Sequence, residues 1–126
     1  MSIAYLDTHV AVFLLDDVSK LSKEAERQIE ANDLLISPMV YLELDYMYQR
    51  KRVSMPADQI YEILHFDFGV QLCHYPFPKV ALEASKFRWT NDPFDRIIVA
   101  QAVANRQSPL ISADGLIRQN YQKTIW

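Results

Sequence analysis

The sequence predicts one α/β domain, spanning residues 1–126, in which a parallel sheet is flanked by helices on both faces. Short apolar runs alternate with longer segments of helical periodicity. Strands that alternate with helices need crossover connections, which pair the strands in parallel. Half of the residues are hydrophobic, so a chain of this length can bury a core without covalent staples.

Five short runs are predicted to be strands. The run IAYL at 3–6 is almost wholly apolar, as expected for a strand that is buried on both faces of a sheet. The runs LLIS, VQLC and PLIS have the same character, and KTIW is a weaker fifth candidate. They occupy residues 34–37, 70–73, 109–112 and 123–126.

Seven helices are predicted between these strands, and several have clear start signals. Ser22 precedes a charged helical segment, and Ser37 with Pro38 combines a cap residue with a proline at the first helical position. Pro56 opens the next helix. The expected helices span roughly residues 9–15, 22–32, 38–52, 56–67, 78–88, 92–106 and 114–121.

The composition excludes several classes of protein. There are only two glycines, Gly69 and Gly115, which excludes a P-loop and a glycine-rich dinucleotide-binding motif. The net charge of −3 argues against a nonspecific nucleic-acid binder, although carboxylates gathered at a metal site would weaken that argument.

Cysteine content and hydropathy bear on the compartment. Cys73 is the single cysteine, so it forms no internal disulfide. It has no partner at zinc-ligand spacing, and we expect it to be a small buried side chain. No apolar stretch is long enough to span a bilayer, and the N-terminus lacks an export signal. We therefore expect a soluble cytoplasmic protein without membrane contact.

Two acidic residues follow predicted strands. Asp7 directly follows the strand at 3–6, and Asp114 follows the strand at 109–112 after one intervening residue. In open parallel sheets, ligands bind beyond the carboxyl ends of the strands, where the strand order reverses. Each acid also has a structural explanation, because Asp is a favoured helix cap and Asp-Gly is a common turn. Taken alone, neither acid identifies a site.

Glu43 is a third candidate because its helix neighbours are apolar. The residues three and four positions away are Met39, Val40, Tyr46 and Met47. A carboxylate on a buried stripe is costly unless it is paired or binds a cation. A salt bridge to Arg50 is the structural alternative.

Asp92 and Asp95 stand three residues apart at the start of an apolar helix. Asp92 precedes Pro93, which matches a cap residue followed by proline at the first helical position. Asp95 then lies in the first turn of a helix that must be largely buried. We expect Asp92 to be a structural cap and Asp95 to be functional.

Four acids converging on one sheet edge favour a divalent cation, because like charges held close together otherwise repel. Oxygen-only ligands suit Mg²⁺ or Mn²⁺. Phosphodiester hydrolysis by metal-activated water is the reaction that such a site favours.

Four segments resemble PIN-domain ribonucleases, and most closely the VapC toxins of bacterial toxin–antitoxin pairs. They are YLDTHV (5–10), SPMVYLEL (37–44), NDPFDRIIVAQA (91–102) and LISAD (110–114), of which the third is the most specific. The resemblance covers essentially the whole chain. It implies a parallel sheet of strand order 3-2-1-4-5, and it implies that Asp7, Glu43, Asp95 and Asp114 form a catalytic, metal-binding quartet.

The same resemblance implies a Mg²⁺- or Mn²⁺-dependent endoribonuclease that cleaves cellular RNA. The implied partners are a cognate antitoxin and a second copy of the chain in a homodimer. Thr8 matches the small hydroxyl residue beside the first acid, a support for metal or water, and Arg96 is a candidate to contact RNA phosphate or to orient a carboxylate. A structural ion pair is an equal alternative for Arg96. The basic segment 49–52 either complements a helix end or contributes to an RNA track.

Other readings of the sequence are weaker. A haloacid dehalogenase-type phosphotransferase needs a second Asp where His9 stands, and a response-regulator receiver needs an acidic neighbour to Asp7. The histidines show no paired spacing, so a histidine-driven ribonuclease is not indicated. A non-catalytic PIN-fold interaction module is the main alternative, and the complete quartet weighs against it.

Overall fold

The sheet has the strand order that the resemblance implied. The computed structural model describes residues 2–126 and contains a five-stranded, all-parallel sheet of order β3-β2-β1-β4-β5. The strands are β1 (Ile3–Leu6), β2 (Asp33–Ile36), β3 (Gln71–Leu72), β4 (Leu110–Ile111) and β5 (Thr124–Ile125). All five predicted strands are present, and the last three are shorter than expected.

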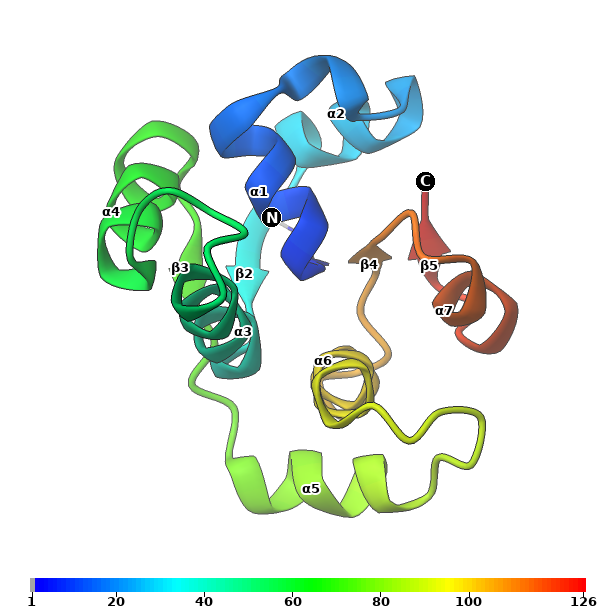
Figure 1. The fold of residues 1–126 in the computed structure, drawn as a ribbon. Coiled ribbons are helices and arrows are strands. Elements are labelled where there is room, and N and C mark those ends of the chain that lie inside the picture. Colours follow the sequence, from blue (N-terminus) through cyan, green and yellow to red (C-terminus); the bar gives the residue numbers. More distant parts are fainter. Residues whose placement is uncertain (1) are drawn as a thin grey trace.

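Helices cover both faces of this sheet. Figure 1 shows α1 and α2 above the row of strands, α6 and α5 below it, and α3 and α4 beside β2 and β3. The bounds are α1 (Thr8–Asp16), α2 (Lys23–Ala31), α3 (Pro38–Gln49), α4 (Ala57–Phe68), α5 (Phe77–Ser85), α6 (Pro93–Ala104) and α7 (Gly115–Asn120), with a 3₁₀ turn η1 (Val18–Lys20) that the sequence did not indicate. No helix within residues 2–126 has the length and apolar character needed to cross a membrane.

Helices α3, α5 and α6 end two or three residues earlier than the sequence predicted, and for α3 and α6 the backbone shows why. Helix α3 stops at Gln49 because Lys51 adopts a left-handed conformation (φ 60°), and the amide of Arg52 donates back to the carbonyl of Met47 at 2.8 Å. Helix α6 stops at Ala104, and Arg106 and Gln107 both have positive φ. Neither helix has glycine at its C-terminus, and the weaker stop signals, the basic segment after α3 and Asn105 after α6, do not fix the last helical residue.

The predicted helix starts are confirmed by side-chain caps. Ser22 accepts a hydrogen bond from the amide of Ala25, and Ser37 accepts one from the amide of Met39. Each cap satisfies a backbone donor that has no partner within its helix. Pro56 directly precedes α4 and has no side chain that can accept such a bond.

A buried polar network joins α6 to the centre of the sheet. Gln101, the polar residue in the apolar middle of α6, accepts from Ser37 Oγ at 3.0 Å and donates to Cys73 Sγ at 3.3 Å. The Tyr5 hydroxyl lies 3.1 Å from Cys73 Sγ and accepts from Asn105 Nδ2 at 2.8 Å. Cys73 is buried, as expected, and burial raises the pKa of the Tyr5 hydroxyl. The network fixes α6 against the ends of β2 and β3.

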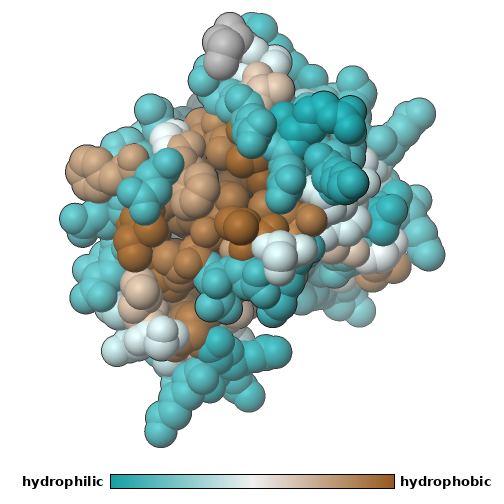
Figure 2. Space-filling model, turned by 90° about the horizontal axis from the view of Figure 1, so that it is seen from above, coloured by the Kyte–Doolittle hydropathy of each residue, from teal (hydrophilic) through white to brown (hydrophobic). Residues whose placement is uncertain are grey.

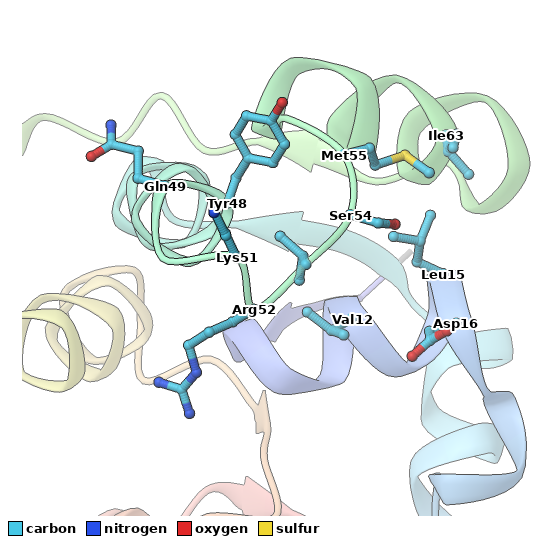
Figure 3. Close-up of a pocket in the computed structure, with 11 residues that line it drawn as sticks. Val12, Leu15, Asp16, Tyr48, Gln49, Lys51, Arg52, Ser54, Met55 and Ile63 are labelled. Atoms are coloured by element: carbon cyan, nitrogen blue, oxygen red, sulfur yellow. The ribbon is translucent and has the colours of Figure 1, made fainter.

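A groove lined by both apolar and polar side chains runs between α1, α4 and the connection from α3 to α4, and we call it the apolar groove after its five hydrophobic residues. Seen from above, apolar side chains gather over this side of the molecule (Figure 2). The groove encloses about 960 Å³, and its apolar lining residues are Val12, Leu15, Val53, Met55 and Ile63 (Figure 3). Arg52 also borders the groove, but Figure 3 shows its guanidinium directed away from it, toward α6.

Replacing Gly69 by alanine is predicted to destabilise the fold. Gly69 ends α4 in the left-handed conformation (φ 70°), where its amide donates to the carbonyl of His65. A β-carbon there strains the backbone by about 1–2 kcal/mol, although no neighbouring atom obstructs it. We expect a melting temperature several degrees below wild type by circular dichroism. Gly115→Ala is the control, because that position is open and its φ is not positive, and an equal loss in both variants would contradict the account.

Candidate active site

The four acids that the sequence singled out line one pocket. It encloses about 540 Å³ at the carboxyl ends of β1 and β4, and Asp7, Glu43, Asp95 and Asp114 all border it. Asp7 comes from the end of β1, Asp114 from the end of β4, Glu43 from the middle of α3 and Asp95 from the first turn of α6. The parallel pairing of β1 with β4 accounts for the meeting of Asp7 and Asp114.

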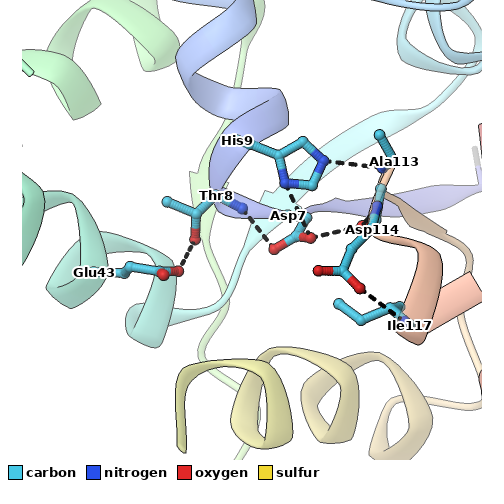
Figure 4. Close-up of polar contacts among 8 residues, drawn as sticks. Asp7, Thr8, His9, Glu43, Ala113, Asp114 and Ile117 are labelled. Carbon is cyan, nitrogen blue, oxygen red and sulfur yellow. Dashed lines mark hydrogen bonds and ion pairs between the residues drawn. The ribbon is translucent and has the colours of Figure 1, made fainter. Parts of the chain in front are cut away.

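Asp7 is the most buried of the four, with 4% of its surface exposed. Its Oδ1 accepts from the amide of Thr8 at 2.8 Å, which caps α1, and its Oδ2 accepts from Ser112 Oγ at 2.6 Å (Figure 4). The ring of His9 lies on the same oxygen, with Nδ1 3.4 Å from Oδ2. The amide of Thr8 and the hydroxyl of Ser112 fix the carboxylate in one orientation and offset part of the cost of burying its charge.

His9 serves to orient Asp7. Its Nε2 accepts a hydrogen bond from the amide of Ala113 at 2.9 Å, so the ring proton of the neutral imidazole lies on Nδ1, facing Asp7. The rings of Phe13 and Trp126 contact the imidazole edge-on. The imidazole thus bridges the end of β1 and the loop after β4.

Glu43 accepts a hydrogen bond from Thr8. Thr8 Oγ1 donates to Glu43 Oε1 at 2.5 Å, and Figure 4 shows the two side chains pointing toward one another. Burial is the main cause that raises the pKa of Glu43, while the bond from Thr8 acts in the opposite direction. The alternative salt bridge is not formed, because Arg50 instead donates to the Tyr46 hydroxyl at 3.1 Å.

Asp95 carries the strongest electrostatic signature of the cluster. Burial, followed by the negative charges of Asp92, Asp7, Asp114 and Glu43, raises its pKa from 3.8 to about 7. All three other members of the quartet therefore act on Asp95 through space. A carboxyl surrounded in this way is typical of a functional site.

Asp92 is the structural cap that the sequence predicted. Its Oδ1 accepts from the amides of Phe94 at 2.8 Å and Asp95 at 3.4 Å, and Pro93 occupies the first position of α6. Asp114 also caps a helix, because its Oδ1 accepts from the amide of Ile117 at 3.0 Å. Asp7 and Asp114 thus each cap a helix and also line the pocket. The sequence had left open whether these two acids are structural caps or site residues.

The donor set of the pocket fits a hard divalent cation. Carboxylate oxygens predominate, and no cysteine borders the pocket. Among residues 2–126, no three His, Cys, Asp or Glu side chains are already grouped closely enough to hold an ion as they stand. Mutual repulsion separates carboxylates that share no cation, so an ion would require the side chains to rotate inward.

Arg96 does not contact the quartet. Its Nη2 donates to the carbonyl of Ala84 near the end of α5 at 3.0 Å, and its Nε is buried without a partner among the described residues. The guanidinium adds a second hydrogen bond to this carbonyl, which also accepts from the amide of Phe87 at 3.1 Å. Within residues 2–126 Arg96 forms no ion pair with a carboxylate, and its contact with RNA phosphate stays a prediction.

Further residues support or line the pocket but were not singled out as site residues. Ser112 binds Asp7, and its position at the end of the fourth predicted strand was a signal that the strand-end rule could have used. Arg52 lines the pocket and belongs to the basic segment 49–52 that the sequence offered as an RNA track. No local pattern distinguished the other lining residues from core or surface residues: Tyr46, Met47, Pro93 and Phe94.

Comparisons with known proteins agree with this architecture. A family model described as "PIN domain" matches residues 4–122. The structure is similar to a chain of VapBC2 from Rickettsia felis bound to a DNA fragment from their promoter, with 17% identity and a TM-score of 0.65, covering 93% of this chain and 92% of that chain. It is also similar to a chain of VapBC-1 from nontypeable Haemophilus influenzae, with 20% identity and a TM-score of 0.62, covering 96% of this chain and 91% of that chain. A chain of DNA-bound VapBC from Salmonella typhimurium is similar as well, with 15% identity and a TM-score of 0.60, covering 98% of this chain and 96% of that chain. At these identities the likeness is one of fold. No curated protein sequence matches the chain.

Replacing Asp95 by asparagine is predicted to stabilise the metal-free protein at alkaline pH. The pKa of Asp95 is raised from 3.8 in the unfolded chain to about 7 in the fold, so the unfolded chain loses this proton at lower pH than the folded protein does. The contribution of Asp95 to the free energy of unfolding therefore falls as the pH rises from about 4 to about 7, and it stays lower above pH 7. The amide carries no charge and escapes this loss. In chelator, we expect Asp95→Asn to melt a few degrees above wild type at pH 8, and the difference to shrink by pH 5.

Asp45→Asn is the control for this experiment. Asp45 lies two residues from Glu43 on the same helix, but its side chain accepts from Gln49 at 2.9 Å and does not border the pocket. We expect no pH-dependent gain in this variant. A fall in the melting temperature of Asp95→Asn at pH 8 would mark Asp95 as a structural residue.

Proposed function

Because the chain belongs to the PIN domain family of nucleases, we propose that it is a metal-dependent endoribonuclease and the toxin of a toxin–antitoxin pair, acting in the cytoplasm. One observation carries the proposal. Four carboxylates from four separate elements, Asp7, Glu43, Asp95 and Asp114, border a single pocket at the carboxyl edge of the sheet. Such a concentration of acid costs stability and is explained by the cation that it would hold.

Each carboxylate has a role consistent with its surroundings. Asp7 is held rigidly by Thr8, Ser112 and His9, so it offers a fixed oxygen to Mg²⁺ or Mn²⁺. Asp95 and Asp114 face the same pocket and supply further oxygens, and Thr8 keeps Glu43 turned toward it. When bound, the cation supplies a water of lowered pKa and neutralises charge on the scissile phosphate.

The chemistry predicts the ends of the products. The pocket presents carboxylates and contains no lysine or paired histidines that could activate a ribose 2′-hydroxyl. His9 is occupied with Ala113 and Asp7. Hydrolysis by water therefore leaves 5′-phosphate and 3′-hydroxyl ends. Cyclic phosphate ends would contradict the mechanism.

Cleavage of total cellular RNA tests the proposal. Purified wild-type protein is incubated with RNA in Mg²⁺, in Mn²⁺ and in excess chelator. We expect cleavage only with metal, and a loss of about 100-fold or more in Glu43→Gln and Asp95→Asn, because each removes charge that helps to hold the cation. Asp45→Asn, an equal change of charge on the same helix, should cleave like wild type.

An inactive protein would favour the non-catalytic interaction module. If wild type and Asp95→Asn leave a broad RNA panel equally intact, the carboxylates have no nuclease function. If both cleave equally, the cleavage comes from a contaminant or from another site.

The partner proposal rests on the solved structures and on the apolar groove. The similar chains come from VapBC assemblies, and the groove between α1 and α4 leaves Val12, Leu15 and Ile63 without a full covering. An antitoxin segment with apolar side chains would bury them. Exposed apolar residues on α3 and α5, among them Leu42, Phe77 and Leu82, are consistent with a homodimer.

A charged side chain in the groove is predicted to release the antitoxin. Ile63→Glu is co-expressed with a candidate antitoxin, and the complex is measured by size-exclusion chromatography. We expect the complex to be lost while metal-dependent RNA cleavage is kept, because the groove lies outside the carboxylate pocket. Val18→Glu in η1, where the side chain is 51% exposed and borders neither the groove nor the carboxylate pocket, is the control and should retain the partner. An intact complex with Ile63→Glu would exclude this groove.

A further inference from the structure

The carboxylate pocket has a second wall that is aromatic and basic. Tyr46 from α3 and Phe94 from α6 border it beside the acids, and their ring centroids lie 5.8 Å apart with an interplanar angle of 40°. Tyr46 is 43% exposed although it is a large ring, so much of its surface is available to a ligand. None of the catalytic roles proposed above uses either ring.

Arg50 holds Tyr46 in place. Its Nη1 donates to the Tyr46 hydroxyl at 3.1 Å, and its guanidinium lies 5.4 Å from the ring centroid. The exposed tyrosine is thus fixed before any ligand arrives, which reduces the entropy lost on binding. Aromatic rings and planar guanidinium groups are both surfaces on which nucleobases stack.

Arg52 brings a positive charge to the mouth of the same pocket. The left-handed Lys51 reverses the chain after α3, and the Arg52 guanidinium is directed toward α6 (Figure 3). Its charge acts on the Glu43 carboxyl, yet no carboxylate among the described residues lies within ion-pair distance of it. An exposed, unpaired arginine beside a phosphodiesterase pocket is suited to bind a phosphate.

We propose that Tyr46, Phe94 and Arg50 form a stacking subsite for a nucleobase of single-stranded RNA, and that Arg52 binds the backbone phosphate leading from this base into the carboxylate pocket. The inference rests on the proposed function and deepens it by naming the form of the substrate. A base can reach these rings only when it is unstacked from its neighbours, so the subsite selects single strands over duplexes. Stacking uses the face that all bases share, so the subsite tolerates sequence.

Equilibrium binding to two probes separates stacking from charge. The Asp95→Asn protein keeps the RNA intact, and fluorescence anisotropy in Mg²⁺ at constant salt compares a labelled oligouridylate with an abasic ribose-phosphate chain of equal length. In this background, Tyr46→Ala should weaken oligouridylate binding by about 5-fold to 150-fold and leave abasic binding within about twofold. Tyr46→Trp should restore the affinity, and Arg52→Gln should weaken both probes.

Tyr48→Ala is the matched control. Tyr48 is 41% exposed on the same helix but borders the apolar groove instead of the carboxylate pocket, so both probes should bind it as they bind the parent. The subsite is overturned if Tyr46→Ala and Tyr48→Ala behave alike, if Tyr46→Ala weakens both probes equally, or if the parent binds neither probe. A change of oligomeric state confined to Tyr46→Ala would instead assign the ring to a contact between copies of the chain.

The cleavage assay distinguishes failure of the ribonuclease proposal from failure of the stacking subsite. If wild type does not cleave RNA in the presence of metal, the ribonuclease proposal is wrong, and the binding measurement, which needs no cleavage, still tests the subsite.

Discussion

The parallel pairing of β1 with β4 is the constraint on which the site depends. β1 lies at the centre of the sheet, between β2 and β4, and its residues Ala4, Tyr5 and Leu6 are almost fully buried. Because β1 and β4 run in the same direction, their carboxyl ends meet, and Ser112 at the end of β4 donates directly to Asp7 at the end of β1. A slip in this register would separate Asp7 from both Ser112 and Asp114.

The fold offsets much, but not all, of the electrostatic cost of its acids. Asp7, Asp95 and Asp114 stand at the N-terminal ends of helices, where free amides and the helix dipole favour negative charge. Glu43 lies in mid-helix and has no such help, and it depends on the Thr8 hydroxyl. The raised pKa values of Asp95 and Glu43 show that repulsion and burial remain. A bound cation would remove this residual cost, so cation binding at these four groups would stabilise the fold.

Local patterns predicted the parts of the structure that depend on local physics. Apolar runs marked the strands, Ser37 and Asp92 marked helix starts, and the strand-end rule pointed to Asp7 and Asp114. The strand order came only from the family resemblance, because pairing joins residues far apart in the chain. The sequence could not show that Lys51 ends α3 in a left-handed conformation and turns Arg52 toward the acids, since no glycine marks the reversal. Nor could the sequence show that Arg96 donates to the carbonyl of Ala84, because that partner belongs to another helix.

Calorimetric titration of the purified protein with Mn²⁺ would show whether these carboxylates form one cation site. We expect binding by wild type at neutral pH, loss of that binding in Asp114→Asn, and unchanged binding in Asp45→Asn, whose carboxylate lies outside the pocket. Equal binding by all three proteins, or no binding by wild type, would mean that the carboxylates do not form a cation site.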